Sequence, residues 1–175
     1  MAKKVAVLVV NPVNGAGLFQ YLEAFFENGI QYKTFAVFDS INVKTNSGVN
    51  LQTDDVIAHL KGNEDEYDAL VFACGDAIPK FSENAGQQYN RDMLVVMKAF
   101  EDKHKVMIGH CAAALLFDNF GVGKGKKVAL HPYIKDAVKE CIGTDEKFVV
   151  DGNIYTAQTE NTIPYLIPEL LKALK

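Results

Sequence analysis

The chain has 175 residues, 49% of them hydrophobic and 23% charged, and a formal net charge of −4 at pH 7. A chain of this length buries roughly 70% of its unfolded surface, so one core is sufficient, and we expect a single domain over residues 1–175. The acidic balance and the scattered lysines argue against nucleic acid as a partner, and no apolar stretch approaches the roughly 18 residues that a membrane span requires.

Strands and helices alternate along the first half of the chain. A continuous apolar run predicts a strand at 5–10, and apolar residues at helical spacing predict a helix from 18 to 26 that Gly29 ends. The next predicted elements are a strand at 32–38, a short helix at 56–60 after a start at Asp54–Asp55, and a buried strand at 69–73.

The same alternation continues in the second half. It predicts a helix with its apolar face over 93–100 and a cap at Asn90, a strand at 106–108, a helix at 112–116 and a short strand at 128–130. A hairpin joins 148–150 to 154–156 across Asp151–Gly152 or Asp151–Gly152–Asn153, and a helix at 163–174 closes the chain. Apolar strands separated by helices predict a parallel sheet covered on both faces.

Cys111 is the most informative residue, because it lies between a buried strand and a helix in the stretch GHCAAALL. Gly109 permits a sharp turn there. In hydrolases with a G-x-S-x-G stretch, such a turn holds the nucleophile clear of the backbone at the carboxyl edge of the sheet. The positive end of a helix dipole also favours the thiolate form. We therefore expect a reactive thiol.

Four loops are predicted to meet at this carboxyl edge, where open α/β sheets bind their ligands. The backbone amides of Gly75 and Ala112 are candidate donors to an oxyanion, because glycine allows close approach and a helix start leaves amides free. The four loops are 11–17, Cys74–Gly75–Asp76, His110–Cys111 and His131–Pro132.

Several stretches together resemble the ThiJ/PfpI superfamily over nearly the whole chain. They are VAVLVV, YDALVFACGDA, GHCAAALL, GKGKKVALHP and VVDGNIYTAQ. That superfamily includes the Parkinson's-disease-associated protein deglycase, glyoxalase-like and chaperone-like proteins, and PfpI-type intracellular proteases. The resemblance implies an α/β, flavodoxin-like three-layer sandwich with a mainly parallel sheet and a nucleophile elbow, as in class I glutamine amidotransferases. It also implies a homodimer or larger homo-oligomer.

The resemblance assigns roles to individual residues as well. It implies that Cys111 is the nucleophilic or oxidisable cysteine, that Gly75 and Ala112 supply oxyanion amides, and that His131 is a histidine near the cysteine. From spacing alone, His131 is equally suited to cap the helix that follows. His110 is expected to be a pocket wall or an interface residue, because neighbouring residues on an elbow point in different directions.

The sequence departs from the family pattern at three places. Gly17 stands where the family usually has a Glu or Asp that hydrogen-bonds the cysteine sulfur, so the family activity does not transfer directly. Cys74 replaces a usual glycine; its favoured role, like that of Cys141, is a small buried hydrophobic residue, and the alternative is a resolving thiol beside the pocket. The stretch TAQTENT replaces a basic, glycine-containing one and alters the pocket rim.

Two functions from different classes remain open. The first is a cysteine-dependent enzyme of the glyoxalase, deglycase or amidase type, in which Cys111 attacks a small carbonyl or amide substrate and His131 moves protons. The second is a redox-sensing or chaperone-like stress protein without turnover, in which Cys111 is oxidised. We expect no cofactor in either case.

A nucleotide-binding protein is ranked below both. Gly15–Ala16–Gly17 follows a strand, and Asp39 ends the next strand, as in a dinucleotide fold, but Gln20 occupies the third glycine position. No zinc-site spacing occurs, so no metal is expected. Three cysteines and the absence of an apolar leader predict a reducing, cytoplasmic location.

Overall fold

The apolar run near the start of the chain forms β1 (Lys4–Val9), an interior strand of a seven-stranded sheet in the computed structural model, which describes residues 3–175. The strand order is β10-β11-β7-β6-β1-β2-β5. Every adjacent pair is parallel except β10 and β11. The other strands are β2 (Gln31–Ala36), β5 (Asp55–Val56), β6 (Ala69–Ala73), β7 (Val106–His110), β10 (Phe148–Asp151) and β11 (Ile154–Ala157).

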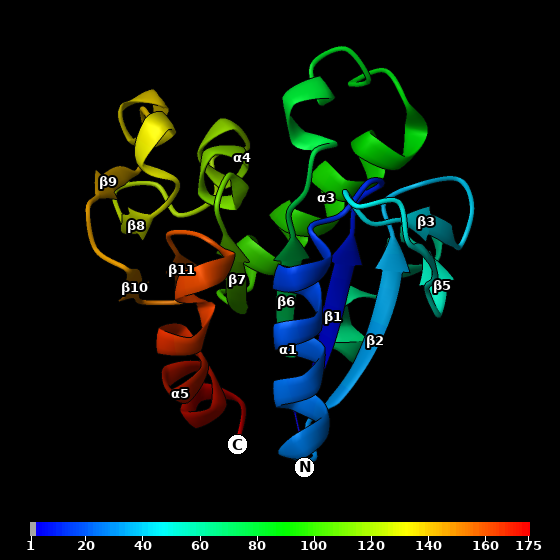
Figure 1. Ribbon diagram of the computed structural model, residues 1–175, viewed down its shortest axis with the longest axis horizontal. Coiled ribbons are helices and arrows are strands. Elements are labelled where there is room, and N and C mark those ends of the chain that lie inside the picture. Colours follow the sequence, from blue (N-terminus) through cyan, green and yellow to red (C-terminus); the bar gives the residue numbers. More distant parts are fainter. Residues whose placement is uncertain (1–2) are drawn as a thin grey trace.

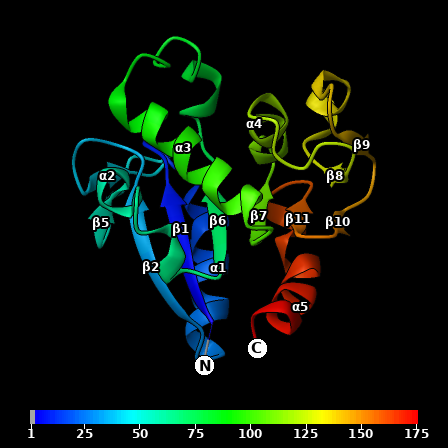
Figure 2. The same cartoon turned by 180° about the vertical axis from the view of Figure 1, so that it is seen from behind.

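Helices cover both faces of this sheet. Figures 1 and 2 show α1 (Gly15–Glu27) and α5 (Ile163–Leu174) on one face and α3 (Gln88–Asp102) on the other. All of β6 is buried, as a parallel strand covered on both faces must be. The short helices are α2 (Ile57–Leu60) and α4 (Ala113–Asn119). The predicted three-layer α/β sandwich is confirmed. Within residues 3–175, no helix is long and apolar enough to cross a membrane.

Smaller elements stand beside the main sheet. A hairpin of β3 (Asn42–Lys44) and β4 (Asn50–Gln52) was not predicted from the sequence. β8 (Lys127–Ala129) pairs with β9 (Ile142–Thr144) in a separate sheet, so the predicted strand at 128–130 is real but lies outside the central one. The 3-10 turns are η1 (Glu64–Glu66), η2 (Ile78–Lys80), η3 (Pro132–Ala137) and η4 (Glu160–Thr162).

Two predicted local roles are wrong. Asn90 does not cap the helix, because α3 already begins at Gln88; the Asn90 side-chain amide instead donates to the Asn84 carbonyl at 2.9 Å. Gly109 does not make the turn, because it lies inside β7. A Cβ at Gly109 would stand 2.4 Å from the Ala113 Cβ, so this glycine is needed for the close approach of α4.

The hairpin near the C-terminus is present as predicted, but neither predicted turn, Asp151–Gly152 or Asp151–Gly152–Asn153, has the right bounds. Asp151 pairs with Ile154 in the β10–β11 ladder, so Gly152 and Asn153 form a two-residue turn. Gly152 has a φ of 62°, which glycine adopts without strain.

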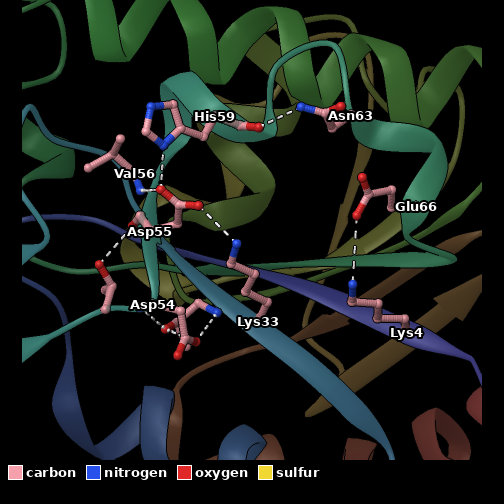
Figure 3. A network of polar contacts seen from close by, with 10 residues as sticks. Lys4, Lys33, Asp54, Asp55, Val56, His59, Asn63 and Glu66 are labelled. Carbon is pink, nitrogen blue, oxygen red and sulfur yellow. Dashed lines mark hydrogen bonds and ion pairs between the residues drawn. The ribbon is translucent and has the colours of Figure 1, made fainter.

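A polar network fixes the outer strand β5, at the edge of the sheet away from β10 (Figure 3). The Asp55 carboxylate accepts from Lys33 Nζ at 2.9 Å and contacts His59 Nδ1 at 2.6 Å, and these bonds, the first above all, lower the pKa of Asp55 to about 2. The Asp54 carboxylate accepts from the Thr34 amide at 2.8 Å. The two aspartates therefore join strands, and the prediction that they start a helix is wrong.

Candidate active site

Cys111 connects β7 to α4 in a backbone conformation that few residues other than glycine adopt. Its φ is 56°, in the left-handed region. Its amide donates to the Ala157 carbonyl at 3.1 Å, and its carbonyl accepts from the His131 amide at 3.4 Å, so neighbouring segments hold the residue on both sides. Strained positions of this kind persist where the surrounding structure fixes them, and they are concentrated at functional sites.

Cys111 lies on the wall of a cavity of about 480 Å³ at the carboxyl ends of β6 and β7. Cys74, Gly75, Asp76 and Ala112 line the same cavity. In Figure 1 this edge is the upper one, where the segment after β6 and the helix α4 stand. Much of the remaining wall is apolar: Ile78, Pro79, Phe81, Leu115, Leu116 and Ile134.

The unpredicted β3–β4 hairpin reaches this cavity through Asn46. Asn46 Nδ2 donates to Asp76 Oδ1, and Asn46 Oδ1 accepts from the Asp76 amide, each at 3.1 Å. The Asn46 amide also donates to the Val13 carbonyl at 2.8 Å. The loops after β1, β3 and β6 are thereby joined, and Asp76 is fixed at the rim.

The sulfur of Cys111 is stabilised in its anionic form. A hydrogen bond from the Cys74 thiol is the largest influence on the Cys111 pKa, and with the Ala112 amide it outweighs burial and the charges of Glu160 and Asp76, so the pKa is lowered. The same bond, together with burial, raises the pKa of Cys74. Of the two thiols, Cys111 therefore has the lower pKa and loses its proton first as the pH rises.

Glu160 is a charged neighbour of the site that sequence reasoning missed. It lies in η4, separated from the end of β11 by two residues, and does not line the cavity, but its charge raises the pKa of Cys74, Cys111 and His110. The Gln20 side-chain amide donates to the Glu160 carbonyl at 3.0 Å, which ties η4 to α1. The sequence held a signal for this residue. The stretch TAQTENT was expected at the pocket rim, and Glu160 is its only carboxylate.

The imidazole ring of His110 fills the space beside Gly17. A Cβ on Gly17 would lie 2.3 Å from His110 Nε2, so the imidazole occupies the room that a side chain at this position would need. Both ring nitrogens of His110 and the Tyr21 hydroxyl are buried without a hydrogen-bond partner among residues 3–175. Burial lowers the pKa of His110 to about 4. The ring is therefore neutral at neutral pH and supplies no charge in place of the family carboxylate.

His131 takes the capping position that spacing left open. Its Nδ1 accepts from the Tyr133 amide at 3.3 Å at the start of η3. The cavity wall includes Ile134 from this segment and not His131. The structure therefore brings Cys74, Gly75, Asp76, Cys111 and Ala112 together around one cavity, whose wall does not include Gly17, His110 or His131.

The glycine-containing start of α1 is capped by a side chain of the protein itself, which makes it a poorer phosphate site. The Asn14 side chain caps the helix, and its Oδ1 accepts from the Gly17 amide at 2.7 Å, which removes one amide that a phosphate would use. Asp39 lies at a separate hollow with Gln88 and Asp92. Within residues 3–175, no group of three His, Cys, Asp or Glu side chains is arranged to hold a metal ion.

Known proteins resemble this chain along its whole length. A model of the DJ-1/PfpI family matches residues 3–173. Protein ppBat of Bacteroides thetaiotaomicron is 63% identical over 175 residues, which is 100% of both chains. The crystal structure of a candidate protease, protease I, from the same organism has a TM-score of 0.98 at 63% identity and covers 99% of this chain and 100% of its own.

More distant solved structures share the fold. Drosophila melanogaster DJ-1beta has a TM-score of 0.85 at 19% identity, over 99% of this chain and 91% of that one. At this identity the likeness concerns the arrangement of strands and helices alone.

Proposed function

Because the chain belongs to the DJ-1/PfpI family, we propose that it is a cysteine-dependent enzyme in which Cys111 attacks the carbonyl or acyl carbon of a small molecule. One observation carries this proposal. Cys111 has a φ of 56° directly after β7 and lines a cavity, and the Cys74 thiol and the Ala112 amide lower its pKa. A lowered pKa increases the fraction of thiolate, which is the nucleophilic form of cysteine.

The chemistry follows from the groups around the sulfur. Attack forms a bond between Cys111 Sγ and the carbonyl carbon, and the π electrons of the carbonyl move to its oxygen. The Ala112 amide lowers the pKa of Cys111, and both Ala112 and Gly75 line the cavity, so their amides are the candidate donors to the developing oxyanion. A 2-oxoaldehyde gives a hemithioacetal once the oxyanion takes up a proton, and transfer of the proton on the adduct carbon to the neighbouring carbon converts it to a thioester. An amide or ester gives a tetrahedral adduct that expels its protonated amine or alcohol and leaves a thioester. In both cases water hydrolyses the thioester, which releases the acid and restores the thiol.

Glu160 is the proposed proton carrier of this reaction. The family pattern has a carboxylate at the position of Gly17, and here the His110 ring occupies that space. The Glu160 carboxylate of η4 is the alternative, because its negative charge raises the pKa of both Cys74 and Cys111. A positioned carboxylate transfers protons between the adduct and water. General acid–base catalysis of this kind typically increases the reaction rate about 10³-fold.

The cavity wall favours a small, uncharged substrate. Among the residues of 3–175 that line it, none is Lys or Arg, and Asp76 stands at the rim. An anionic substrate would therefore find no positive partner there. Methylglyoxal and other short aldehydes fit this description. The relative described as a candidate protease suggests a peptide bond as the alternative substrate. A peptide is therefore the second substrate to be assayed.

A Glu160→Gln variant tests the proposal. We expect its rate of methylglyoxal consumption to fall about 100-fold, because the amide cannot accept a proton. Removal of a charge that raises the Cys111 pKa should also make Cys111 alkylation faster below pH 8. This opposite change distinguishes a lost proton carrier from a misfolded site.

Glu23→Gln is the matched control, since Glu23 is exposed on α1. It should retain the wild-type rate. Equal methylglyoxal consumption by the Glu160→Gln and wild-type proteins would remove Glu160 from the mechanism, and cleavage of a peptide substrate without loss of methylglyoxal would replace the aldehyde by an amide.

A further inference from the structure

The two cysteines at the cavity lie opposite each other on neighbouring strands. In the parallel pair β6–β7, Ala69 pairs with Val106 and Phe72 with Gly109. The same register, continued two residues beyond Phe72, sets Cys74 opposite Cys111. Neighbouring strands are about 4.8 Å apart, and disulfides join Cα atoms roughly 4.4–6.8 Å apart. Continued to this point, the register makes the two residues neighbours at a strand spacing that a disulfide can span.

The side chains agree with the register. Both thiols are free and line the same cavity, and each has the largest influence on the pKa of the other. Cys74 is 4% exposed, whereas Cys111 is only partly buried and lies on the cavity wall. Because Cys111 is the more exposed of the two, an oxidant that enters the cavity is expected to react first with its sulfur.

We propose that Cys74 is a resolving thiol that forms a reversible disulfide with Cys111 when a peroxide oxidises the site. This inference concerns regulation of the same sulfur that the proposed function uses, but it requires no turnover. The disulfide removes the nucleophile without destroying it, and a small dithiol restores it by exchange. Without Cys74, the oxidised sulfur of Cys111 would proceed to the irreversible sulfinic and sulfonic acids.

The two steps balance with hydrogen peroxide as the oxidant. In the first, the Cys111 thiolate attacks one peroxide oxygen, the S–O bond forms, the O–O bond breaks, and hydroxide leaves; the sulfur is oxidised by two electrons and the peroxide is reduced. In the second, Cys74 loses its proton and attacks the sulfenic sulfur. The S–S bond forms, the S–O bond breaks, and the departing hydroxide leaves with that proton as water.

Cys141 provides an internal control. It is buried elsewhere, its thiol donates to the Gly123 carbonyl at 3.3 Å, and burial raises its pKa to about 12. It does not line the cavity of Cys111. We therefore expect Cys141 to take no part in the oxidation.

The test is mass spectrometry of the reduced full chain after hydrogen peroxide, with free thiols then blocked by iodoacetamide. We expect the wild-type chain to lose two hydrogens and to yield one linked peptide pair containing Cys74 and Cys111, which dithiothreitol separates. The Cys141→Ala variant should behave in the same way. In Cys74→Ala and in Cys74→Ser, sulfinic acid at Cys111 should rise about tenfold over wild type.

Two results would overturn the inference. One is sulfinic acid at Cys111 of the wild-type chain with Cys74 still free to react with iodoacetamide. The other is a disulfide that pairs either cysteine with Cys141. The measured quantity is the covalent state of the sulfurs and does not depend on turnover. A chain that forms the disulfide but consumes no aldehyde would therefore refute the proposed enzymatic function and leave the resolving role of Cys74 intact.

Discussion

Replacement of Cys111 by serine is expected to lower methylglyoxal consumption at least about 1,000-fold. The hydroxyl of serine is a weak nucleophile unless a base adjoins it, and the histidine next in sequence, His110, is buried and does not line the cavity. The lowered pKa that prepares the Cys111 sulfur has no counterpart in a hydroxyl. The measurement is the initial rate at saturating aldehyde.

The Cys141→Ser variant controls for the loss of a thiol elsewhere, and it should retain the wild-type rate. Thermal unfolding of Cys111→Ser should be near that of the wild-type chain, because sulfur and oxygen differ little in size. A Cys111→Ser protein that consumes aldehyde as fast as wild type would exclude Cys111 as the nucleophile.

Gly75→Ala is expected to lower the free energy of unfolding by about 3 kcal/mol or more, because no side chain fits at this position. A Cβ there would lie 2.3 Å from the Pro12 carbonyl oxygen and 2.5 Å from the Val13 Cα, which are backbone atoms with no rotamer to change. The loop after β6 would have to move away from the loop after β1, and this movement would open the cavity wall.

Gly86→Ala is the matched control, since a Cβ at Gly86 meets nothing within 4 Å. Denaturant unfolding should leave that variant within about 0.5 kcal/mol of wild type. Equal stability of the Gly75→Ala and Gly86→Ala variants would mean that the two loops do not pack backbone against backbone.

The framework of this fold is readable from the sequence because it depends on local patterns. The apolar run at 5–10 predicted β1, and the turn at 152–153 fell within the predicted hairpin. Cys111 stood out for the same reason, since a buried strand, a bend and a helix follow one another directly. Where a polar residue bonds a distant strand, as Asp54 does, local pattern assigned it the wrong role.

The composition of the site was harder to predict, because it depends on contacts between distant segments. His110 leaves no room for a side chain at Gly17, and the two residues lie in segments far apart in the chain. The influence of the Glu160 charge on the Cys111 pKa depends on how the chain packs between β11 and η4. No spacing rule encodes either contact. The predicted homo-oligomer and the cytoplasmic location stay predictions.

The pH dependence of Cys111 alkylation tests the central claim most directly, namely that the Cys74 thiol lowers the pKa of Cys111. Reaction with iodoacetamide follows the thiolate fraction, which is half at the pKa and rises with pH. Because the pKa of Cys111 is lowered, the half-maximal rate should fall below pH 8.5, about where a free thiol titrates. Cys74→Ala removes the donor and should move the midpoint upward, whereas Cys74→Ser keeps an O–H donor and should move it less. A wild-type midpoint at or above that of a free thiol, unchanged in Cys74→Ala, would contradict the account.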